Sequence, residues 1–421
     1  MKNSVTILLV VVSLTTLTFG QVNLSDSYKK FYNEGSFKEA ITFISKIDTS
    51  KRTAEDWFYL AQSYNSNKEI LPAVQAYQKA VQLNPVHNGF RISFARALNL
   101  SGNTNSAIEN LNEIVKTDST NIATLSDLGS IYLTTKKYQR ARSTFEKLLE
   151  LNYTDYLSHY YLALSVYNMN TAQPDTDAVP NHLIHCLINN SRFTPARDLL
   201  GNYYFTKQQY KRALTEYEVS SYNKNSDPEA HFKIGLCLEK LKYFGTAIPS
   251  YEKAIVLDST VANYHSHLGY CYYMEEKMDS AVGAYSRAAI LDKDNPTVFQ
   301  NLGMAYLKLD SLDAAKHSFE AALQNFGLMQ MTFIINQIGF INLKQSKFEE
   351  AREACEKVLA LEPENVYASF NIARVYDEQK KYSTAVKLYK KALPLIKDVQ
   401  SMQSEYKYTL DRIKDLEKQR G

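Results

Sequence analysis

The feature that most constrains this chain is a short phrase that returns along its length. Residues 73–85 read AVQAYQKAVQLNP, and related phrases follow as AIPSYEKAIVLD from Ala247 and AVGAYSRAAILD from Ala281, 34 residues apart. Each phrase predicts an amphipathic helix with a small residue first, an aromatic residue four positions later and another small residue three beyond that. Because 421 residues exceed one ordinary core, this fixed period indicates an array of similar units.

Two ladders of small residues follow the same period. The first contains only alanine: Ala73, Ala107, Ala141, Ala213, Ala247, Ala281, Ala315, Ala351 and Ala385. The second lies twelve residues upstream and contains only glycine or alanine: Ala61, Ala95, Gly129, Ala163, Gly201, Gly235, Gly269, Gly303, Gly339 and Ala373. Glycine inside a helix costs about 1 kcal/mol relative to alanine, so we expect the ladders to mark a close approach of two helix backbones.

One copy of the repeat, from Ala54 to His87, fills every landmark of a known pattern: Trp57, Leu60, Ala61, Tyr64, Ala73, Tyr77, Ala80 and Pro85. In these residues the chain resembles the tetratricopeptide-repeat family. The resemblance implies an all-α fold: an α-solenoid of about eleven helix-turn-helix repeats in a right-handed superhelix. We expect the array to span residues 21–397, with copies starting near residues 21, 54, 88, 122, 156, 194, 228, 262, 296, 332 and 366.

The two ends of the chain differ from the array. Residues 1–20 place Lys2 before an apolar run and end on Thr18 and Gly20, a pattern that predicts a cleaved signal peptide and export to the periplasm, the cell surface or the medium. An uncleaved N-terminal anchor is the alternative, although the run is shorter than the ~20 apolar residues of a spanning helix. At the other end, residues 398–421 predict an amphipathic helix that caps the array.

Composition and motifs argue against several functions. The 48 Lys and Arg residues nearly balance the 45 Asp and Glu residues and form no basic tract, so we expect no nucleic-acid partner. No segment after residue 20 is long and apolar enough to cross a bilayer. The four cysteines are expected to be free, packed thiols, since equivalent positions on stacked repeats lie beyond disulfide reach.

Histidines are the one possible sign of chemistry. His182, His185 and Cys186 share a helical face that could bind zinc or copper, but no fourth ligand is recognisable. His159, His231 and His265 occupy the repeat position of Trp57 and are expected to pack. No hydrolase, nucleotide or metalloprotease motif is present, so we predict no catalytic residue, no cofactor and no metal.

In tetratricopeptide repeats the first helix of each copy lines a concave groove. The repeat positions of Phe58, Gln62 and Asn65 are therefore candidate contacts for a protein or peptide partner of a non-catalytic scaffold. The predicted groove residues are Phe58, Tyr160, Tyr167, Asn202, Phe205, Phe232, Tyr270, Tyr273, Gln300, Asn336, Phe340 and Phe370. An aromatic groove that tracks a polysaccharide during export or uptake is the alternative function. A clamp for peptide C-termini is disfavoured, because no copy has lysine at the position of Phe58.

Overall fold

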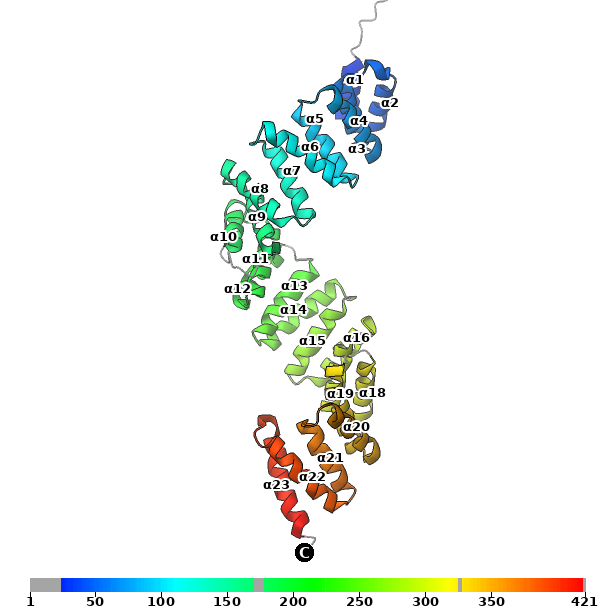
Figure 1. Ribbon diagram of the computed structural model, residues 1–421, viewed down its shortest axis with the longest axis vertical. Coiled ribbons are helices and arrows are strands. Elements are labelled where there is room, and N and C mark those ends of the chain that lie inside the picture. Colours follow the sequence, from blue (N-terminus) through cyan, green and yellow to red (C-terminus); the bar gives the residue numbers. More distant parts are fainter. Residues whose placement is uncertain (1–23, 170–177, 224, 325–327, 419–421) are drawn as a thin grey trace, which may run out of the picture. The chain divides into compact units, whose positions relative to one another are not determined.

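The computed structural model describes residues 24–169, 178–223, 225–324 and 328–418, and the predicted signal peptide lies outside them. Within these ranges every regular element is a helix, and consecutive helices pack against one another in antiparallel pairs (Figure 1). The predicted all-α solenoid is therefore confirmed. None of the helices in these ranges is long and apolar enough to span a membrane. Contacts divide the chain into unit 1, which ends at Ala196, and unit 2, which starts at Arg197.

Unit 1 contains five helix pairs and the 3₁₀ helix η1 (Thr49–Lys51) among its described residues. Their first helices are α1 (Leu24–Asn33), α3 (Ala54–Ser66), α5 (Asn88–Leu100), α7 (Ile122–Thr134) and α9 (Tyr156–Met169). Their second helices are α2 (Phe37–Ser45), α4 (Ile70–Leu83), α6 (Thr104–Thr117), α8 (Tyr138–Leu151) and α10 (Ala178–Asn189).

Unit 2 continues the pattern with six pairs among its described residues. Their first helices are α11 (Thr194–Thr206), of which most belongs to this unit, α13 (Pro228–Lys240), α15 (Ala262–Met274), α17 (Pro296–Lys308), α19 (Leu328–Lys344) and α21 (Val366–Glu378). Their second helices are α12 (Tyr210–Asn223), α14 (Phe244–Leu257), α16 (Met278–Leu291), α18 (Leu312–Leu323), α20 (Phe348–Leu361) and α22 (Tyr382–Ile396). The 3₁₀ helix η2 (Gln400–Met402) leads into the last helix, α23 (Gln403–Lys418).

The small-residue ladders lie at the contact between the two helices of a pair. All nine alanines of the first ladder are fully buried. Five of the six glycines of the second ladder face an aromatic ring rather than a helix backbone, which corrects the physical reason expected for them. The sixth, Gly339, faces Cβ of Ala354 and the backbone oxygen of Ala351. A Cβ atom added at Gly129 would lie 2.6 Å from Cζ of Phe145, and one added at Gly235 would lie 2.6 Å from Cε1 of Tyr251. These glycines make room for a ring on the second helix.

The turn between the two helices of a pair closes in the left-handed backbone conformation. Gly35 and Gly102 take this role in two pairs, whereas a non-glycine residue does so in eight others among the described residues, as at Lys136 with φ +57°. There the N–H of Lys137 donates to the carbonyl of Tyr132 at 2.8 Å and so satisfies the end of α7. Residues with a side chain rarely adopt this conformation, and the repeat pattern did not predict it.

Four cysteines are free and buried, as expected: Cys186, Cys237, Cys271 and Cys355. Burial raises the pKa of each thiol to about 12. At neutral pH these thiols are therefore protonated packing groups without nucleophilic thiolate character.

The last helix, α23, packs against α22, whose apolar face is covered by Ile413 and Leu416 of α23 and by Met402 of η2. In α23, the guanidinium of Arg412 donates two hydrogen bonds of 2.8 and 2.9 Å to the carboxylate of Asp377 on α21. The side chain of Asp377 is only 4% exposed, and it also accepts a hydrogen bond from the hydroxyl of Tyr389 at 3.1 Å. A buried carboxylate is thus paired across the contact that holds α23 in place.

The fit of ring against glycine predicts the effect of Gly235→Ala. The new methyl group would displace the ring of Tyr251, so the free energy of unfolding should fall by about 1–3 kcal/mol in urea denaturation. Gly283→Ala in α16 is the matched control, because a Cβ there meets no atom within 4 Å. It should raise helix stability by about 0.5–1 kcal/mol. Equal destabilisation by both variants would contradict the packing argument.

The pairing of Asp377 predicts that Arg412→Ala releases α23. Leaving the carboxylate buried without its cation should cost about 3 kcal/mol and remove hydrogen-exchange protection from α23. The control is Lys390→Ala, which breaks a 2.7 Å ion pair with Glu417 whose side chains are 58% and 49% exposed. That surface pair should contribute less than about 1 kcal/mol. Unchanged protection in Arg412→Ala would show that apolar packing alone holds the helix.

Candidate functional site

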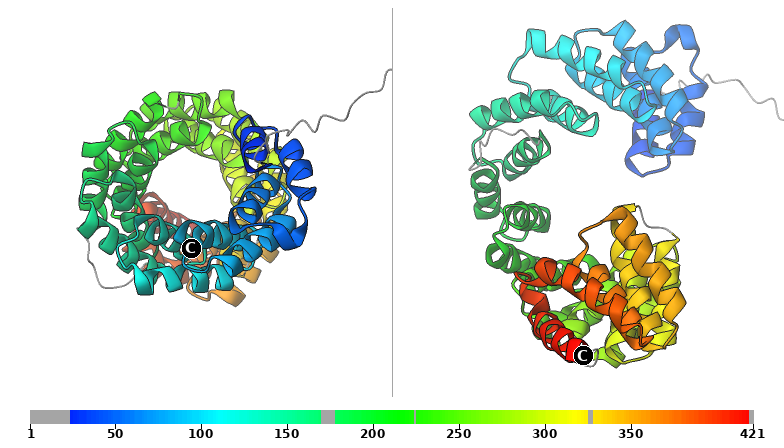
Figure 2. Two further views of the ribbon diagram at one scale, coloured as in Figure 1. Left: turned by 90° about the horizontal axis from the view of Figure 1, so that it is seen from above. Right: turned by 60° about the horizontal axis from the view of Figure 1, so that its bottom comes forward.

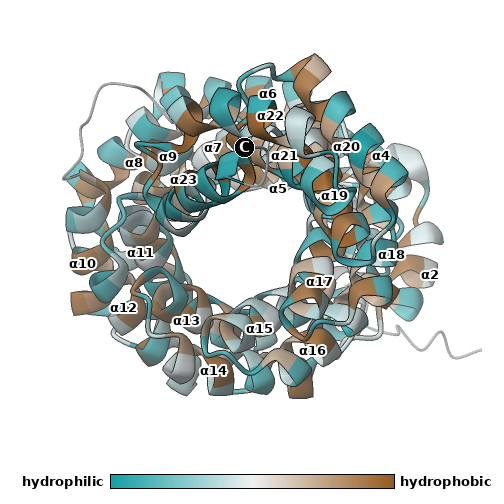
Figure 3. Ribbon diagram, turned by 90° about the horizontal axis from the view of Figure 1, so that it is seen from below, coloured by the Kyte–Doolittle hydropathy of each residue, from teal (hydrophilic) through white to brown (hydrophobic). Residues whose placement is uncertain are grey.

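The candidate groove residues all lie on the first helices of their pairs, and these helices lie on the inner side of each unit. In unit 2, helices α13, α15, α17 and α19 lie inside α12, α14, α16 and α18 (Figure 3). In unit 1, helices α5, α7 and α9 lie inside α6, α8 and α10, and the same order of inner and outer helices is visible from above (Figure 2). Each unit thus presents its first helices on a concave face.

Several candidate aromatics pack against neighbouring rings. The ring of Phe58 is stacked on that of Phe90 with centroids 4.6 Å apart, and the ring of Tyr77 lies at 5.7 Å. Phe232 lies 4.8 Å from Tyr264 and 5.7 Å from Tyr251. These rings join one helix pair to the next and leave little surface for a partner.

The remaining aromatic candidates differ in exposure. Tyr270 is the most open, with 36% of its surface exposed, and its ring meets that of Phe244 edge to face. Phe370 is 7% exposed beside Tyr389. Five others are half-buried: Tyr160, Tyr167, Phe205, Tyr273 and Phe340. Tyr270 is therefore the best placed of these rings to meet a ligand.

Two of the three polar candidates make hydrogen bonds inside the protein. The amide oxygen of Asn202 accepts from the hydroxyl of Tyr217 at 2.7 Å. Asn336 is only 7% exposed, and its amide N–H donates to Asn365 at 3.1 Å. Gln300 is half-buried. Asn202 and Asn336 thus help to hold neighbouring helices together.

Two hollows lie on the first-helix face of unit 1, at positions that the predicted groove residues do not include. A hollow of about 170 Å³ is lined by Tyr32, Gln62, Asn65, Ser66, Tyr77, Ser93, Arg96 and Ala97. A second hollow of about 320 Å³ is lined by Arg96, Asn99, Leu100, Leu111, Asp127, Ser130, Ile131 and Thr134. Helices α3, α5 and α7 supply most of these side chains, so the hollows follow the inner face.

Arg96 is the residue that the two hollows share. Its Nε donates to the carboxylate of Asp127 at 2.7 Å, and 57% of its side chain remains exposed. In the smaller hollow the amide oxygen of Asn65 is buried and meets no hydrogen-bond partner among the described residues. A guanidinium with exposed donors therefore lies in the same hollow as a residue whose amide oxygen is buried and unpartnered.

Gln62 and Asn65 defined groove positions in the sequence, but aromatic residues at the equivalent positions were favoured over them. The charge at Arg96, 31 residues before an acidic side chain at Asp127, was the signal that could have revealed the polar hollows.

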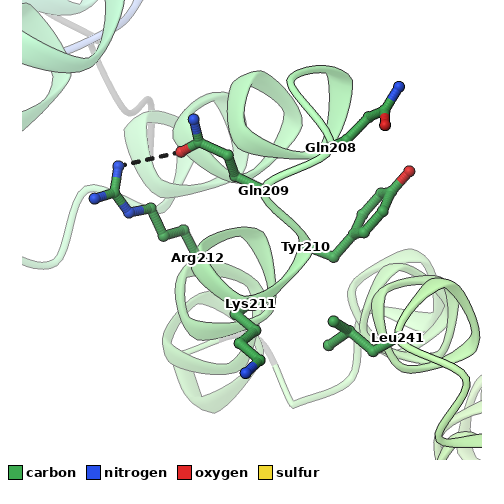
Figure 4. Close-up of a pocket in the computed structure, with 6 residues that line it drawn as sticks. All are labelled: Gln208, Gln209, Tyr210, Lys211, Arg212 and Leu241. Atoms are coloured by element: carbon green, nitrogen blue, oxygen red, sulfur yellow. Dashed lines mark hydrogen bonds between the residues drawn. The ribbon is translucent and has the colours of Figure 1, made fainter.

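A third hollow, of about 430 Å³, lies at a helix turn of unit 2 (Figure 4). It is lined by Gln208, Gln209, Tyr210, Lys211, Arg212 and Leu241. The guanidinium of Arg212 donates to the amide oxygen of Gln209 at 3.1 Å. Because this hollow surrounds the α11–α12 turn, it is separate from the first-helix face.

Unit 2 buries a polar cluster between α13, α14 and α15. The carboxylate of Glu239 accepts from the hydroxyl of Tyr251 at 2.8 Å and from Nδ1 of His267 at 2.7 Å. Burial acts to raise the pKa of Glu239, but the hydrogen bonds from His267 and Tyr251 outweigh it and hold the pKa below its usual range. The cluster ties three helices together.

The histidines considered as metal ligands form a second polar cluster, in unit 1. Nδ1 of His159 lies 3.0 Å from Nδ1 of His182, and the ring of His185 is stacked on that of His159 at 5.2 Å. Cys186 is fully buried beside them. Within the described ranges, no three His, Cys, Asp or Glu residues are arranged to hold a metal ion.

Family models match the chain in both units. The model for the cytochrome c-type biogenesis protein H TPR domain matches residues 40–157. Models for the tetratricopeptide repeat match residues 228–260, 296–325 and 342–406. The chain is a tetratricopeptide-repeat protein. The resemblance inferred from the repeat landmarks is thereby confirmed.

A curated relative of this tetratricopeptide-repeat protein is the putative cytochrome c-type biogenesis protein CcmH of Haemophilus influenzae. The two are 30% identical over 111 residues, which is 25% of this chain. The match spans only 24% of that relative's length.

Solved structures with a similar fold share little sequence with the chain. YrrB, described as a TPR protein with an unusual peptide-binding site, is 21% identical and covers 43% of this chain and 91% of its own, with a TM-score of 0.39. A tetratricopeptide-repeat protein from Parabacteroides merdae is 12% identical over 60% of this chain and 98% of its own, with a TM-score of 0.44. Yeast Tom70 is 15% identical and covers 94% of this chain and 95% of its own, with a TM-score of 0.37.

The packing of Phe58 predicts that Phe58→Ala acts on stability. Losing the stack with Phe90 and the contact with Tyr77 should lower the free energy of unfolding by about 2–3 kcal/mol in urea denaturation. Gln62→Ala, one helical turn along α3, is the control and should change it by less than about 0.5 kcal/mol. An unchanged stability of Phe58→Ala would instead indicate that Phe58 is a free contact residue.

Proposed function

We propose that this tetratricopeptide-repeat protein is a non-catalytic scaffold that binds an extended segment of a partner protein on its first-helix faces. Arrays of paired helices present long curved surfaces, and proteins of this fold are in general interaction scaffolds. The observation that carries the proposal is the pair of hollows that meet at Arg96 in unit 1, of which the smaller is lined mainly by polar groups. Buried, protonated cysteines support a non-catalytic role.

The chemistry of the hollows suits a peptide backbone. The exposed guanidinium nitrogens of Arg96 can donate to carbonyl or carboxylate acceptors. An extended peptide offers one donor and one acceptor at every residue other than proline. Gln62 and Ser93 in the same hollow add both kinds of group.

In unit 2, we propose that the exposed ring of Tyr270 and the neighbouring Tyr273 supply apolar contacts to the bound segment. The other predicted groove residues remain proposed contacts through their exposed edges. Asn336 and Phe370, both 7% exposed, are expected to shape the groove from beneath rather than touch a partner.

The setting of this scaffold is a further part of the proposal. Residues 1–20 would direct export and be removed, residues 21–397 would form the array and residues 398–421 its cap. Likeness over residues 40–157 to a cytochrome c biogenesis TPR domain supports a location in the cell envelope.

Site-specific photo-crosslinking in the source cells tests the proposal. A benzophenone side chain at Gln62 should crosslink to one continuous stretch of a partner polypeptide, read by mass spectrometry. The matched control position is Lys79 on the exposed face of α4, which should give little product. Arg96→Ala should reduce the yield at Gln62 about tenfold or more, because charge-assisted hydrogen bonds contribute about 1.5–3 kcal/mol each.

Two outcomes would contradict peptide binding in the groove. Equal crosslinking from Lys79 and Gln62 would mean that the partner does not select the concave face. A crosslinked product made of carbohydrate, without a peptide, would favour the polysaccharide-handling role instead.

A further inference from the structure

Three histidines at one repeat position make the same hydrogen bond. Nε2 of His159, His231 and His265 lies 2.8, 3.3 and 3.1 Å from the backbone carbonyl six residues earlier, at Tyr153, Asn225 and Ser259 respectively. A carbonyl can only accept, so each Nε2 carries its hydrogen. Among the described residues, only His159 has further imidazoles against its ring, those of His182 and His185.

The hydrogen bond from Nε2 of His159 to the carbonyl of Tyr153 determines which nitrogen of the neutral ring carries the hydrogen. Neutral His159 with hydrogen on Nε2 leaves Nδ1 as a bare acceptor, and Nδ1 of His182 at 3.0 Å donates to it. Nε2 of His185, meanwhile, lies 3.3 Å from the hydroxyl of Tyr153. If both His159 and His182 were protonated on both nitrogens, two N–H groups would face each other and the bond between α9 and α10 would break.

In the imidazole cluster of His159, His182 and His185, the surroundings of the first two favour neutral rings. His159 is fully buried, and burial, together with the nearby ring of His185, holds its pKa below 6.5 despite its bond to Tyr153 and the charge of Asp155. Burial likewise lowers the pKa of His182, helped by the two other imidazoles.

Two charged groups on α8, beneath the cluster, have opposite effects on the pKa of His182. On α8, the carboxylate of Glu146 would favour a charged His182, but Arg142 opposes it and is bound to that carboxylate at 2.7 Å. Cys186 on α10 is protonated at neutral pH and adds no charge. No group around the cluster therefore offers a free negative charge to an incoming proton on His182.

We propose that the imidazole cluster makes the α9–α10 hairpin open in mildly acidic solution. The opened hairpin binds protons at the ordinary histidine pKa of 6.5, whereas the closed hairpin resists them. Stability of the hairpin is therefore complete above about pH 6.5 and falls as the pH drops below that value. Each of the two imidazoles that resist protonation, His159 and His182, changes the opening equilibrium by up to about tenfold per pH unit.

Opening of this hairpin would also disturb partner binding. Helix α9 carries Tyr160 and Tyr167, two of the proposed groove contacts, so acid would weaken binding in this part of unit 1. That consequence rests on the proposed function, whereas the opening itself does not.

Hydrogen exchange of the free full-length protein tests the opening separately from binding. After correction for the intrinsic rate, protection of α9–α10 should fall by about tenfold or more between roughly pH 6.5 and pH 5.5. The α15–α16 hairpin is the internal control, because His265 occupies the same repeat position without an imidazole partner against its ring. Equal loss of protection in both hairpins would overturn the proposal.

Substitution identifies the groups responsible. His182→Gln keeps an N–H donor for His159 but removes a titrating ring. The loss of hydrogen-exchange protection of α9–α10 in acid should therefore be smaller by about tenfold per pH unit. His265→Gln should leave it unchanged. If His182→Gln lowers the melting temperature at about pH 7.5, His182→Asn provides the same comparison. An unchanged acid response in the folded variant would overturn the role of the cluster.

Discussion

The fit of an aromatic ring against a small residue is the contact on which at least five of the helix pairs depend. Phe145 on Gly129 and Tyr251 on Gly235 show how the missing Cβ lets the second helix approach the first. In three pairs the ring belongs to a tyrosine whose hydroxyl reaches a polar side chain of the first helix: Tyr217 reaches Asn202, Tyr251 reaches Glu239 and Tyr389 reaches Asp377. One ring therefore packs the pair and fixes side chains near the concave face.

This dual use decides which inner-face groups remain for a partner. The side-chain oxygens of Asn202 and Glu239 already accept hydrogen bonds from tyrosine hydroxyls. In unit 1 the ring of Tyr77 lines a hollow instead, where the amide oxygen of Asn65 has no partner among the described residues. The same scaffold thus closes some groove positions and opens others, through the placement of single hydroxyl groups.

The sequence predicted the features that recur with the period and failed on those that do not. The ladders at Ala73 and Gly235 imposed paired helices, because small residues at a fixed spacing of 34 mark equivalent buried contacts in successive units. Side-chain pairs between neighbouring helices could not be predicted from a fixed spacing along the sequence. Glu239 meets His267 after 28 residues, Arg96 meets Asp127 after 31 and Asp377 meets Arg412 after 35, because rotamers and helix ends differ from copy to copy. For the same reason the sequence did not reveal that several predicted aromatic contacts pack against neighbouring rings.

The cation that pairs a buried carboxylate differs between the interior of unit 2 and its end. Glu239 is paired with an imidazole, which is charged only when protonated, whereas Asp377 is paired with a guanidinium that stays charged at every pH. The guanidinium in the contact that holds α23 therefore keeps its charge in acid. Because each repeat contacts mainly its neighbours, the proposed protonation of His159 and His182 would loosen their own hairpin first.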